Sequence, residues 1–294
     1  MKWRRTSGSG GVEDLRGKSS GGGIPMGRIG GGLGGAGIAG IIIALLFTFL
    51  GGGSGFDPGS GLDQLNPTPA ATGNDVAQGP DPDANLVAFV RFVVDDVQES
   101  WTVVFTNLGQ EYQPTTLRLF TARISTGCGA ASSATGPVYC PVDRFVYLDL
   151  GFFRELRDRF GAPGDFAQAY VIAHEYGHHV QNLLGILPEV SRRQQQNPGE
   201  ANELSVKLEL QADCFAGVWA HSAYAQNQLE AGDLEEGLQA ASSVGDDRIQ
   251  QSANGRIDPE SFTHGTAEQR RNWFLTGFQE GDPAACNTFT ASRL

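Results

Sequence analysis

The sequence predicts an α+β fold that is mostly helical and contains a small sheet. Long segments with apolar residues spaced three and four apart predict helices, whereas only two short segments have the composition of strands. These two segments follow each other instead of alternating with helices, which argues against a parallel α/β fold. We therefore expect a small, antiparallel sheet. An apolar segment near the N-terminus predicts one transmembrane helix in front of this domain.

The first part of the domain is predicted to contain two helices and two strands. Residues 85–105 lack Gly and Pro and have helical apolar spacing, so they predict a helix. Thr116–Ser125 alternates in polarity, and Phe145–Leu150 is rich in aromatic and branched residues, so both predict strands. Phe152–Phe160 predicts a short helix.

The second part of the domain is predicted to be helical. Asp165 and Gln168 have the spacing of a capping box, and the uninterrupted segment after them predicts a helix that ends at Gly185. A loop is expected around Asp246, between the last two helices. The expected ranges of the later helices are Glu200 to about Gln228, Asp233–Ser243 and Thr266–Gln279.

The N-terminal third predicts a membrane anchor and a tether. No charged residue occurs between Arg28 and Asp57, and residues 29–50 are Gly-rich and then strongly apolar. As a helix they could cross a bilayer core of about 30 Å. A cleaved signal peptide is the alternative, but a polar leader precedes the segment and no A-x-A sequence follows Leu50. We expect a basic leader (1–28), a transmembrane helix (29–50), a flexible Gly/Pro/Asp linker (51–83) and a folded domain (84–294).

The distribution of charge predicts an orientation and excludes one class of function. Residues 1–50 contain six basic and two acidic residues, whereas residues 51–294 contain 15 and 31. The positive-inside rule then places the leader in the cytoplasm and the domain outside, with one helix in the lipid bilayer of the cell membrane. The acidic domain lacks the basic surface that nucleic acid requires, so we expect no nucleic-acid partner.

All four cysteines lie in the predicted extracytoplasmic domain, where an oxidising compartment favours disulfide bonds. Cys128 and Cys140 bracket a loop rich in Gly, Ala, Ser and Pro and form the favoured local pair, which leaves Cys214 for Cys286. Three connectivities are possible from sequence, and four buried thiols are a further alternative. No C-x-x-C is present, which disfavours a cysteine-based zinc site.

The segment His174-Glu175-Tyr176-Gly177-His178 is an H-E-x-x-H sequence inside a predicted helix. Residues four apart share one helix face, so His174 and His178 can bind one metal ion while Glu175 approaches a water held by that ion. We therefore expect one Zn²⁺ per chain; a structural helix with two solvated histidines is the alternative. Gln181 and Leu184 stand where the metzincin pattern requires Gly and His, so that class is excluded.

A catalytic zinc site with two histidines needs a third protein ligand and an open position. Glu209 and Asp213 are four residues apart on the next long predicted helix. We expect Glu209 to be the third ligand and Asp213 to hydrogen-bond a ligand histidine. Glu200, Glu203 and His221 are competing ligands, but only the Glu209 and Asp213 pair offers both a ligand and an orienting group on one face.

HEYGHHVQ and ELQADCFAGVWA resemble the bacterial neutral zinc metallopeptidase family, and more broadly the gluzincins, with an H-E-x-x-H helix and an E-x-x-x-D helix. The similarity extends over almost the whole chain and includes CG…GPVYCPVDRFVYLDLGFF, VGDDRIQ and SFTHGTAEQRRNWFLTGF. The resemblance implies a zincin-like fold, zinc binding by His174, His178 and Glu209, and a catalytic role for Glu175. It does not define the substrate.

The function predicted from these features is that of a membrane-anchored zinc metallopeptidase acting outside the cytoplasm. Glu175 is expected to accept a proton from the attacking water. His264, on a Gly-flanked loop, is a candidate oxyanion donor, and helix capping is its alternative role. A peptide or protein substrate is expected to lie along the strand Thr116–Ser125. The alternative functions are a catalytically silent, zinc-stabilised envelope scaffold and a zinc hydrolase of a non-peptide amide.

Overall fold

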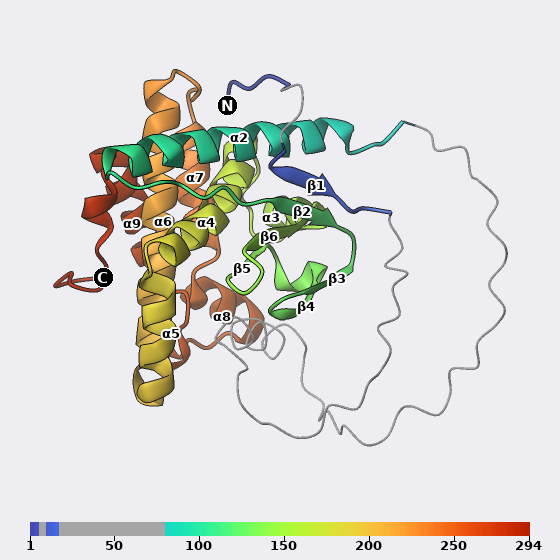
Figure 1. The fold of residues 1–294 in the computed structure, drawn as a ribbon. Coiled ribbons are helices and arrows are strands. Elements are labelled where there is room, and N and C mark those ends of the chain that lie inside the picture. Colours follow the sequence, from blue (N-terminus) through green and yellow to red (C-terminus); the bar gives the residue numbers. More distant parts are fainter. Residues whose placement is uncertain (6–9, 18–79) are drawn as a thin grey trace, which may run out of the picture.

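The computed structural model describes residues 1–5, 10–17 and 80–294, and Figure 1 shows their arrangement. The described helices are α2 (Ala84–Asn107), α3 (Gly151–Asp158), α4 (Asp165–Leu183), α5 (Ile186–Gln196), α6 (Ala201–Ala225), α7 (Asp233–Ser243), α8 (Asp246–Asn254) and α9 (Ala267–Glu280). The described strands are β1 (Val12–Asp14), β2 (Leu117–Phe120), β3 (Arg123–Thr126), β4 (Gly129–Ser132), β5 (Val138–Cys140) and β6 (Phe145–Asp149). The expected α+β fold with a helical majority is confirmed.

Two helices depart from the sequence-based expectation. α5 lies in a segment for which the sequence indicated no element, and α8 occupies the expected loop around Asp246, so that loop prediction is wrong. Asp246 and Asp247 lie in the first turn of α8, where carboxylates favour the positive end of the helix dipole. Gly164, rather than Asp165, is the N-cap of α4, so the expected capping box is absent.

The main sheet has the strand order β1-β2-β6-β5. β1 and β6 both pair in parallel with β2, and only β5 runs antiparallel to β6, so the expectation of an antiparallel sheet is corrected. β3 and β4 form a separate antiparallel hairpin. The expected strand Thr116–Ser125 is divided between β2 and β3, and β2 is an internal strand. β2 therefore cannot be the free edge that was expected to receive a substrate.

The zinc-motif helix α4 and the helix α6 lie in the core, and α9 packs directly on α6 (Figure 1). A Cβ atom at Gly217 of α6 would lie 2.1 Å from a carbonyl oxygen of α9, and one at Gly277 of α9 would lie 1.9 Å from a carbonyl oxygen of α6. Glycine is required at both positions because the two backbones are in contact. This close crossing brings Arg270 of α9 to Asp213 of α6.

The N-terminal residues pack on the domain. β1 is the outer strand of the main sheet, and the amino group of Met1 donates a hydrogen bond to Asp165 at 2.6 Å. Residues 1–5 and 10–17 therefore lie against the folded domain. None of the helices in the described part of the chain is both long and apolar enough to cross a membrane. The helix expected over residues 29–50 and most of the expected linker lie outside the described residues.

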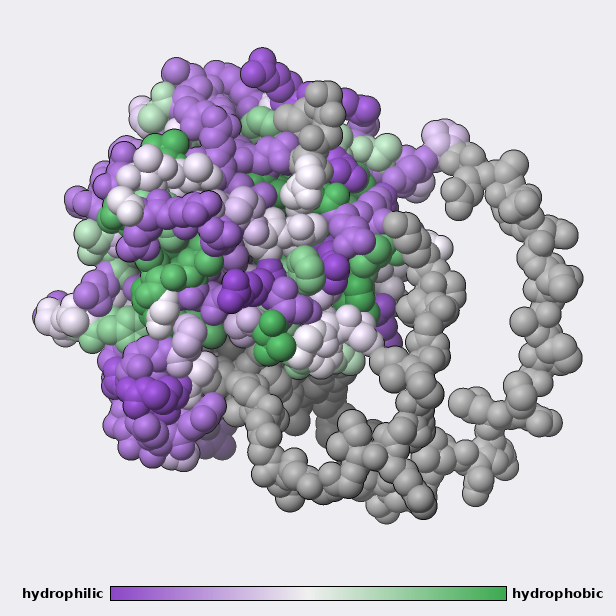
Figure 2. Space-filling model, viewed as in Figure 1, coloured by the Kyte–Doolittle hydropathy of each residue, from purple (hydrophilic) through white to green (hydrophobic). Residues whose placement is uncertain are grey.

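The surface seen in Figure 2 is largely hydrophilic, with hydrophobic residues in small groups between the polar ones. This distribution is typical of a folded domain in water. The larger apolar side chains are instead collected between α2, α4, α6 and the main sheet, with Trp101, Trp219 and Tyr176 almost fully buried.

Candidate metal centre and active site

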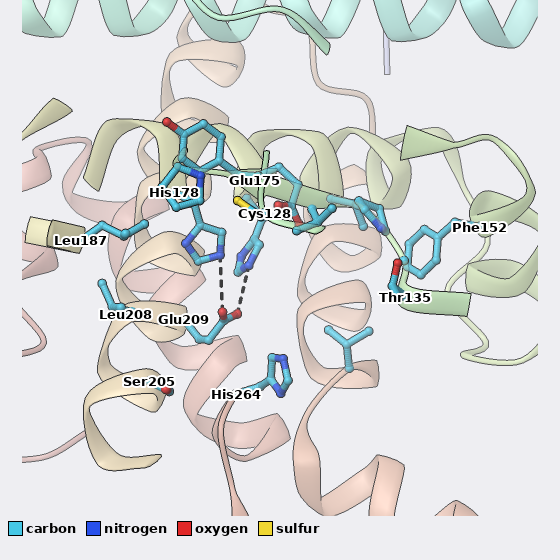
Figure 3. A pocket seen from close by; sticks show the side chains of 18 of the residues that line it. Cys128, Thr135, Phe152, Glu175, His178, Leu187, Ser205, Leu208, Glu209 and His264 are labelled. Carbon is cyan, nitrogen blue, oxygen red and sulfur yellow. Dashed lines mark ion pairs between the residues drawn. The ribbon is translucent and has the colours of Figure 1, made fainter. Parts of the chain in front are cut away.

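The structure brings three of the predicted metal ligands together. His174 and His178 lie on α4, and Glu209 lies on α6. Figure 3 shows Glu209 facing His178. Nε2 of His174 lies 3.2 Å from one carboxylate oxygen of Glu209, and Nε2 of His178 lies 3.4 Å from the other. One ligand atom from each residue falls within 4.8 Å of the others, so a single metal ion can contact all three.

Asp213 orients His174, as the spacing of the carboxylates on α6 predicted. Nδ1 of His174 donates a hydrogen bond to Oδ1 of Asp213 at 2.9 Å. This bond leaves Nε2 of His174 with its lone pair directed toward Glu209. Burial lowers the pKa of His174, but the carboxylates of Asp213 and Glu209 outweigh burial and raise this pKa to about 10.

Gln181 performs the corresponding task for His178. Nδ1 of His178 donates a hydrogen bond to Oε1 of Gln181 at 2.9 Å, which again leaves Nε2 free for a metal. The amide of Gln181 is fixed in turn because its Nε2 donates to the carbonyl of Leu208 at 2.7 Å and to Oε1 of Gln211 at 3.1 Å. Gln181 is fully buried. Gln181, which stands where the metzincin pattern requires Gly, thus positions His178.

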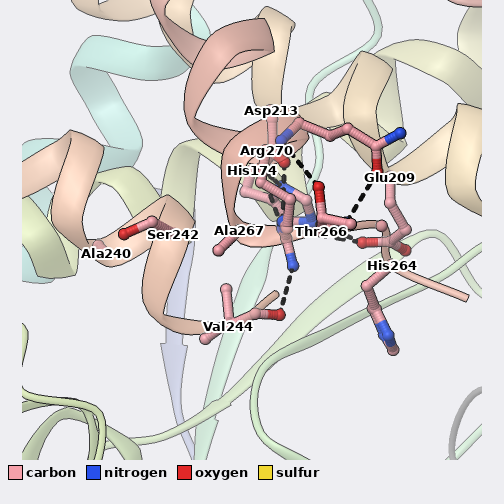
Figure 4. Close-up of polar contacts among 12 residues, drawn as sticks. His174, Glu209, Asp213, Ala240, Ser242, Val244, His264, Thr266, Ala267 and Arg270 are labelled. Atoms are coloured by element: carbon pink, nitrogen blue, oxygen red, sulfur yellow. Dashed lines mark hydrogen bonds and ion pairs between the residues drawn. The ribbon is translucent and has the colours of Figure 1, made fainter. Parts of the chain in front are cut away.

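Arg270 neutralises the buried carboxylates behind the ligands (Figure 4). It donates to both oxygens of Asp213, at 2.8 and 2.9 Å, and it lies 4.0 Å from Glu209. Tyr170 donates a further hydrogen bond to Asp213. Burial opposes the charge on Asp213, but Arg270 and His174 outweigh burial and hold the pKa of Asp213 below its ordinary value. His178 and His174 likewise outweigh burial and hold the pKa of Glu209 well below its ordinary value, so both carboxylates are anionic.

Glu175 lies next to the ligand histidine on α4 and lines a cavity of about 590 Å³ that also contains the three ligands. Its side chain is directed into this cavity in Figure 3. The cavity walls are largely apolar and come from α3, the β5–β6 region, α5 and α6; the apolar lining residues include Val138, Val142, Phe152, Phe160, Leu187 and Leu208. Glu175 thus shares one largely apolar cavity with the three candidate metal ligands.

His264 lines the same cavity, on the side of Glu209 (Figure 3). Its Nδ1 lies 3.0 Å from Oδ1 of Asp246, and the other oxygen of Asp246 accepts hydrogen bonds from the backbone N–H groups of Thr263, His264 and Gly265. Burial opposes protonation, but the carboxylates of Asp246 and Glu209 together outweigh burial and raise the pKa of His264. Thr266, not His264, caps α9, so the capping alternative for His264 does not apply.

The competing ligands lie elsewhere. Glu203 is exposed and pairs with Lys207 at 2.6 Å, and Glu200 lies 3.5 Å from Arg193. Nδ1 of His221 donates to the carbonyl of Phe278 at 2.7 Å. None of these three side chains is among the residues that line the cavity.

Both favoured disulfide bonds are present. Cys128 is bonded to Cys140 and Cys214 to Cys286, and the described part of the chain contains no free cysteine. The first bond joins the β3–β4 turn to β5, and Cys128 lines the cavity. The second bond ties α6, which carries Glu209, to the C-terminal segment.

Sequence reasoning missed three residues that shape the site: Gln181, Arg270 and Asp246. The three-residue spacing of Gln181 from His178 places the two on neighbouring positions of one helix face, so this contact could have been found. Arg270 and Asp246 reach the site from other helices. Only the contact between α6 and α9, which Gly217 and Gly277 permit, reveals the position of Arg270.

Two helix-borne histidines and a buried glutamate that can share one metal ion, with a second glutamate in the same apolar cavity, define a candidate zinc hydrolase. Residues 1–289 match the family described as "Putative neutral zinc metallopeptidase", and the chain belongs to this family. It is 46% identical over 301 residues to Uncharacterized protein YpfJ of Escherichia coli K12, covering 99% of this chain and all of the relative. It is also 46% identical over 258 residues to Uncharacterized protein Rv2575 of Mycobacterium tuberculosis H37Rv, covering 82% and 85% of the two chains. No solved structure matches the chain.

Proposed function

We propose that the protein is a zinc-dependent peptidase with its active site between α4, α6 and the loop that carries His264. The observation that supports this proposal most strongly is the convergence of His174, His178 and Glu209 within 4.8 Å, beside Glu175. Membership of a family described as neutral zinc metallopeptidases supports the same class of reaction.

The donor set fits zinc. Two imidazole nitrogens and one carboxylate are a common ligand set of catalytic zinc, and the partner of each Nδ1 holds the ring in the tautomer that a metal requires. Glu209 and Asp213 place two buried carboxylates beside Arg270, and this acidic pair favours binding of a divalent cation. The cluster contains three protein ligands among the described residues, whereas a structural zinc site usually has four. This difference favours an enzyme over a scaffold.

The side chains have separable roles in the proposed reaction. A zinc ion bound here would lower the pKa of water and polarise the scissile carbonyl. Glu175 accepts the proton of the attacking water and later returns it to the leaving amine. His264, with Nδ1 held by Asp246, presents Nε2 as a donor toward the oxygen on which negative charge develops.

The walls of the cavity favour a substrate with bulky apolar side chains. Val138, Phe152 and Leu208 line the cavity, so transfer of such a side chain from water into it would be favourable. The edge strand at this cavity is β5, which pairs only with β6 and has its other edge free among the described strands. An extended substrate can pair with that edge, in place of the β2 edge expected from sequence.

The cellular location is also part of this proposal. Two disulfide bonds support an oxidising compartment, and therefore action outside the cytoplasm. Attachment to the lipid bilayer is proposed from the uncharged, apolar composition of residues 29–50.

Hydrolysis of a quenched peptide library by the full-length, oxidised protein tests the proposal. The wild type and the control Glu203→Gln, an exposed position on α6, should cleave peptides with bulky apolar residues. Glu175→Gln should retain zinc and lose activity by at least a factor of about 10². Zinc binding without cleavage by the wild type would favour the scaffold or the non-peptide amide hydrolase.

A further inference from the structure

β1 is the edge strand of the main sheet on the side opposite β5. Val12–Asp14 pair in parallel with Leu117–Leu119 of β2, residue by residue. Across this pair, Nε of Arg118 donates to a carboxylate oxygen of Glu13 at 2.8 Å. Without β1, the backbone groups on this side of β2 would have no strand partner. Residues near the start of the chain are thus part of the sheet that supports the active site.

The N-terminal residues also pack into the apolar surface of α2. Trp3 contacts the rings of Phe89 and Phe92, with centroid distances of 5.5 and 6.4 Å. Val12 is buried in the main core. Gly11 lies so close to α2 that a Cβ atom there would be 2.9 Å from a methyl carbon of Val94. This packing is that of an integral element, not of a segment resting on the surface.

Arg16 connects the two ends of the segment 18–79. Its guanidinium donates to Asp14 at 2.8 Å on the N-terminal side, and to Asp81 at 2.7 Å and Asp83 at 3.3 Å on the C-terminal side. Such partly exposed ion pairs add little stability individually. They nevertheless show that Arg16, Asp81 and Asp83 lie close together at the N-terminal end of α2.

From these contacts we propose that residues 1–5, 10–17 and 80–294 form one folded body in one compartment. Strand pairing, apolar packing and the Arg16 ion pairs all require that no membrane separates Glu13 from Arg118. A single crossing at residues 29–50, with a cytoplasmic leader and an external domain, is not compatible with this body. Both ends of the segment 18–79 then lie on the same side of any membrane that it enters. This inference is independent of the zinc site.

Cross-linking in intact cells tests the proposal. The full-length double variant Glu13→Cys/Arg118→Cys is treated with a short, membrane-permeant bismaleimide, and linked peptides are identified by mass spectrometry. We expect positions 13 and 118 to be joined, by the reagent or by a disulfide bond. The control Glu13→Cys/Ile257→Cys should give no link, because Ile257 follows α8, which lies far from β1 in Figure 1. Absence of the 13–118 link, when each thiol alone reacts with a maleimide, would overturn the proposal.

A second measurement does not depend on strand geometry. Gly10 is exposed and has free space around its Cα, and Val103 of α2 is 57% exposed. The full-length single variants Gly10→Cys and Val103→Cys are treated in intact cells with a membrane-impermeant maleimide. We expect both positions to react, or both to react only after permeabilisation. Reaction of one position alone in intact cells would place the two segments on opposite sides and overturn the proposal.

Discussion

Arg270 donates two hydrogen bonds to Asp213, at 2.8 and 2.9 Å, while Asp213 accepts the Nδ1 proton of His174. The ligand histidine is therefore fixed through a chain of contacts that begins on α9 and passes through α6 to α4. Because each member is buried, loss of one leaves a charge or a polar group without its partner.

The first prediction concerns Arg270. Arg270→Met should weaken zinc binding by about 10–100-fold, because the free Asp213 carboxylate no longer holds His174 in one orientation. Competition with a chromophoric chelator measures this change. Arg271→Met is the matched control because Arg271 is the exposed neighbour on α9. Equal zinc affinity in Arg270→Met and the control would contradict the positioning role.

The second prediction concerns Gln181. Gln181→Leu removes the acceptor of the His178 Nδ1 proton and the donor to the Leu208 carbonyl. We expect zinc affinity to fall by about 10–100-fold and the free energy of unfolding to fall by about 1–3 kcal/mol. Gln196→Leu, at an exposed position of α5, should change neither quantity. Chelator competition and denaturant unfolding provide the two measurements, and unchanged zinc affinity in Gln181→Leu would refute this role.

The third prediction concerns His264 and Asp246. His264→Gln should lower kcat by about 10²–10³-fold with zinc content unchanged, because it removes a donor that acts on developing charge. Asp246→Asn should have a smaller effect, and the double variant should be no worse than His264→Gln alone. Steady-state kinetics on one cleaved peptide resolve kcat and KM. Additive losses in the double variant would mean that Asp246 does not act through His264.

The fourth prediction compares the two disulfide bonds. Cys214–Cys286 closes a loop of 72 residues and Cys128–Cys140 closes one of 12. Loop-closure entropy then assigns about 4 kcal/mol to the first bond and about 3 kcal/mol to the second. The double variant Cys214→Ser/Cys286→Ser should therefore unfold at a lower denaturant concentration than the double variant Cys128→Ser/Cys140→Ser. The reverse order would show that entropy of loop closure does not dominate here.

The fifth prediction concerns pH and Arg16. Hydrogen bonds from Arg16 outweigh partial burial and hold the pKa of Asp14 below its ordinary value of 3.8. A lowered folded-state pKa gives stability that is fully present above pH 3.8 and is lost as pH falls through the folded-state pKa. Arg16→Gln should lower the free energy of unfolding by less than about 1 kcal/mol near pH 7, and the difference from wild type should shrink below pH 4. Unfolding of both proteins in urea at pH 7, 5 and 3.5 measures this difference in the free energy of unfolding. A difference that stays constant over this pH range would contradict the role of Arg16.

The residues that sequence reasoning found share local periodicity. His174, Glu175 and His178 lie together on α4, and Glu209 and Asp213 lie together on α6. The spacing within each helix therefore indicates which side chains can act together. Most helices were predictable for the same reason. α8 was not, because its short sequence is polar and its first turn is held through Asp246 by the distant loop at His264.

The features that sequence reasoning missed depend on contacts between distant segments. β1 has only three residues, and its strand conformation is fixed by β2, more than 100 residues later. The parallel direction of β2 and β6 likewise depends on how the chain crosses between them, which no local pattern reports. Arg270 acquires its role only where Gly217 and Gly277 allow α6 and α9 to touch.

The zinc content of the intact full-length protein is the most direct test of the metal centre. Mass spectrometry under native conditions should find one zinc per chain in the wild type, in Glu175→Gln and in the control Glu203→Ala. Glu209→Ala should lose the metal while the protein remains folded, because Glu209 supplies the third ligand of the cluster. A wild type that binds no zinc after reconstitution, or a Glu209→Ala variant that binds it as tightly as the control, would contradict the account.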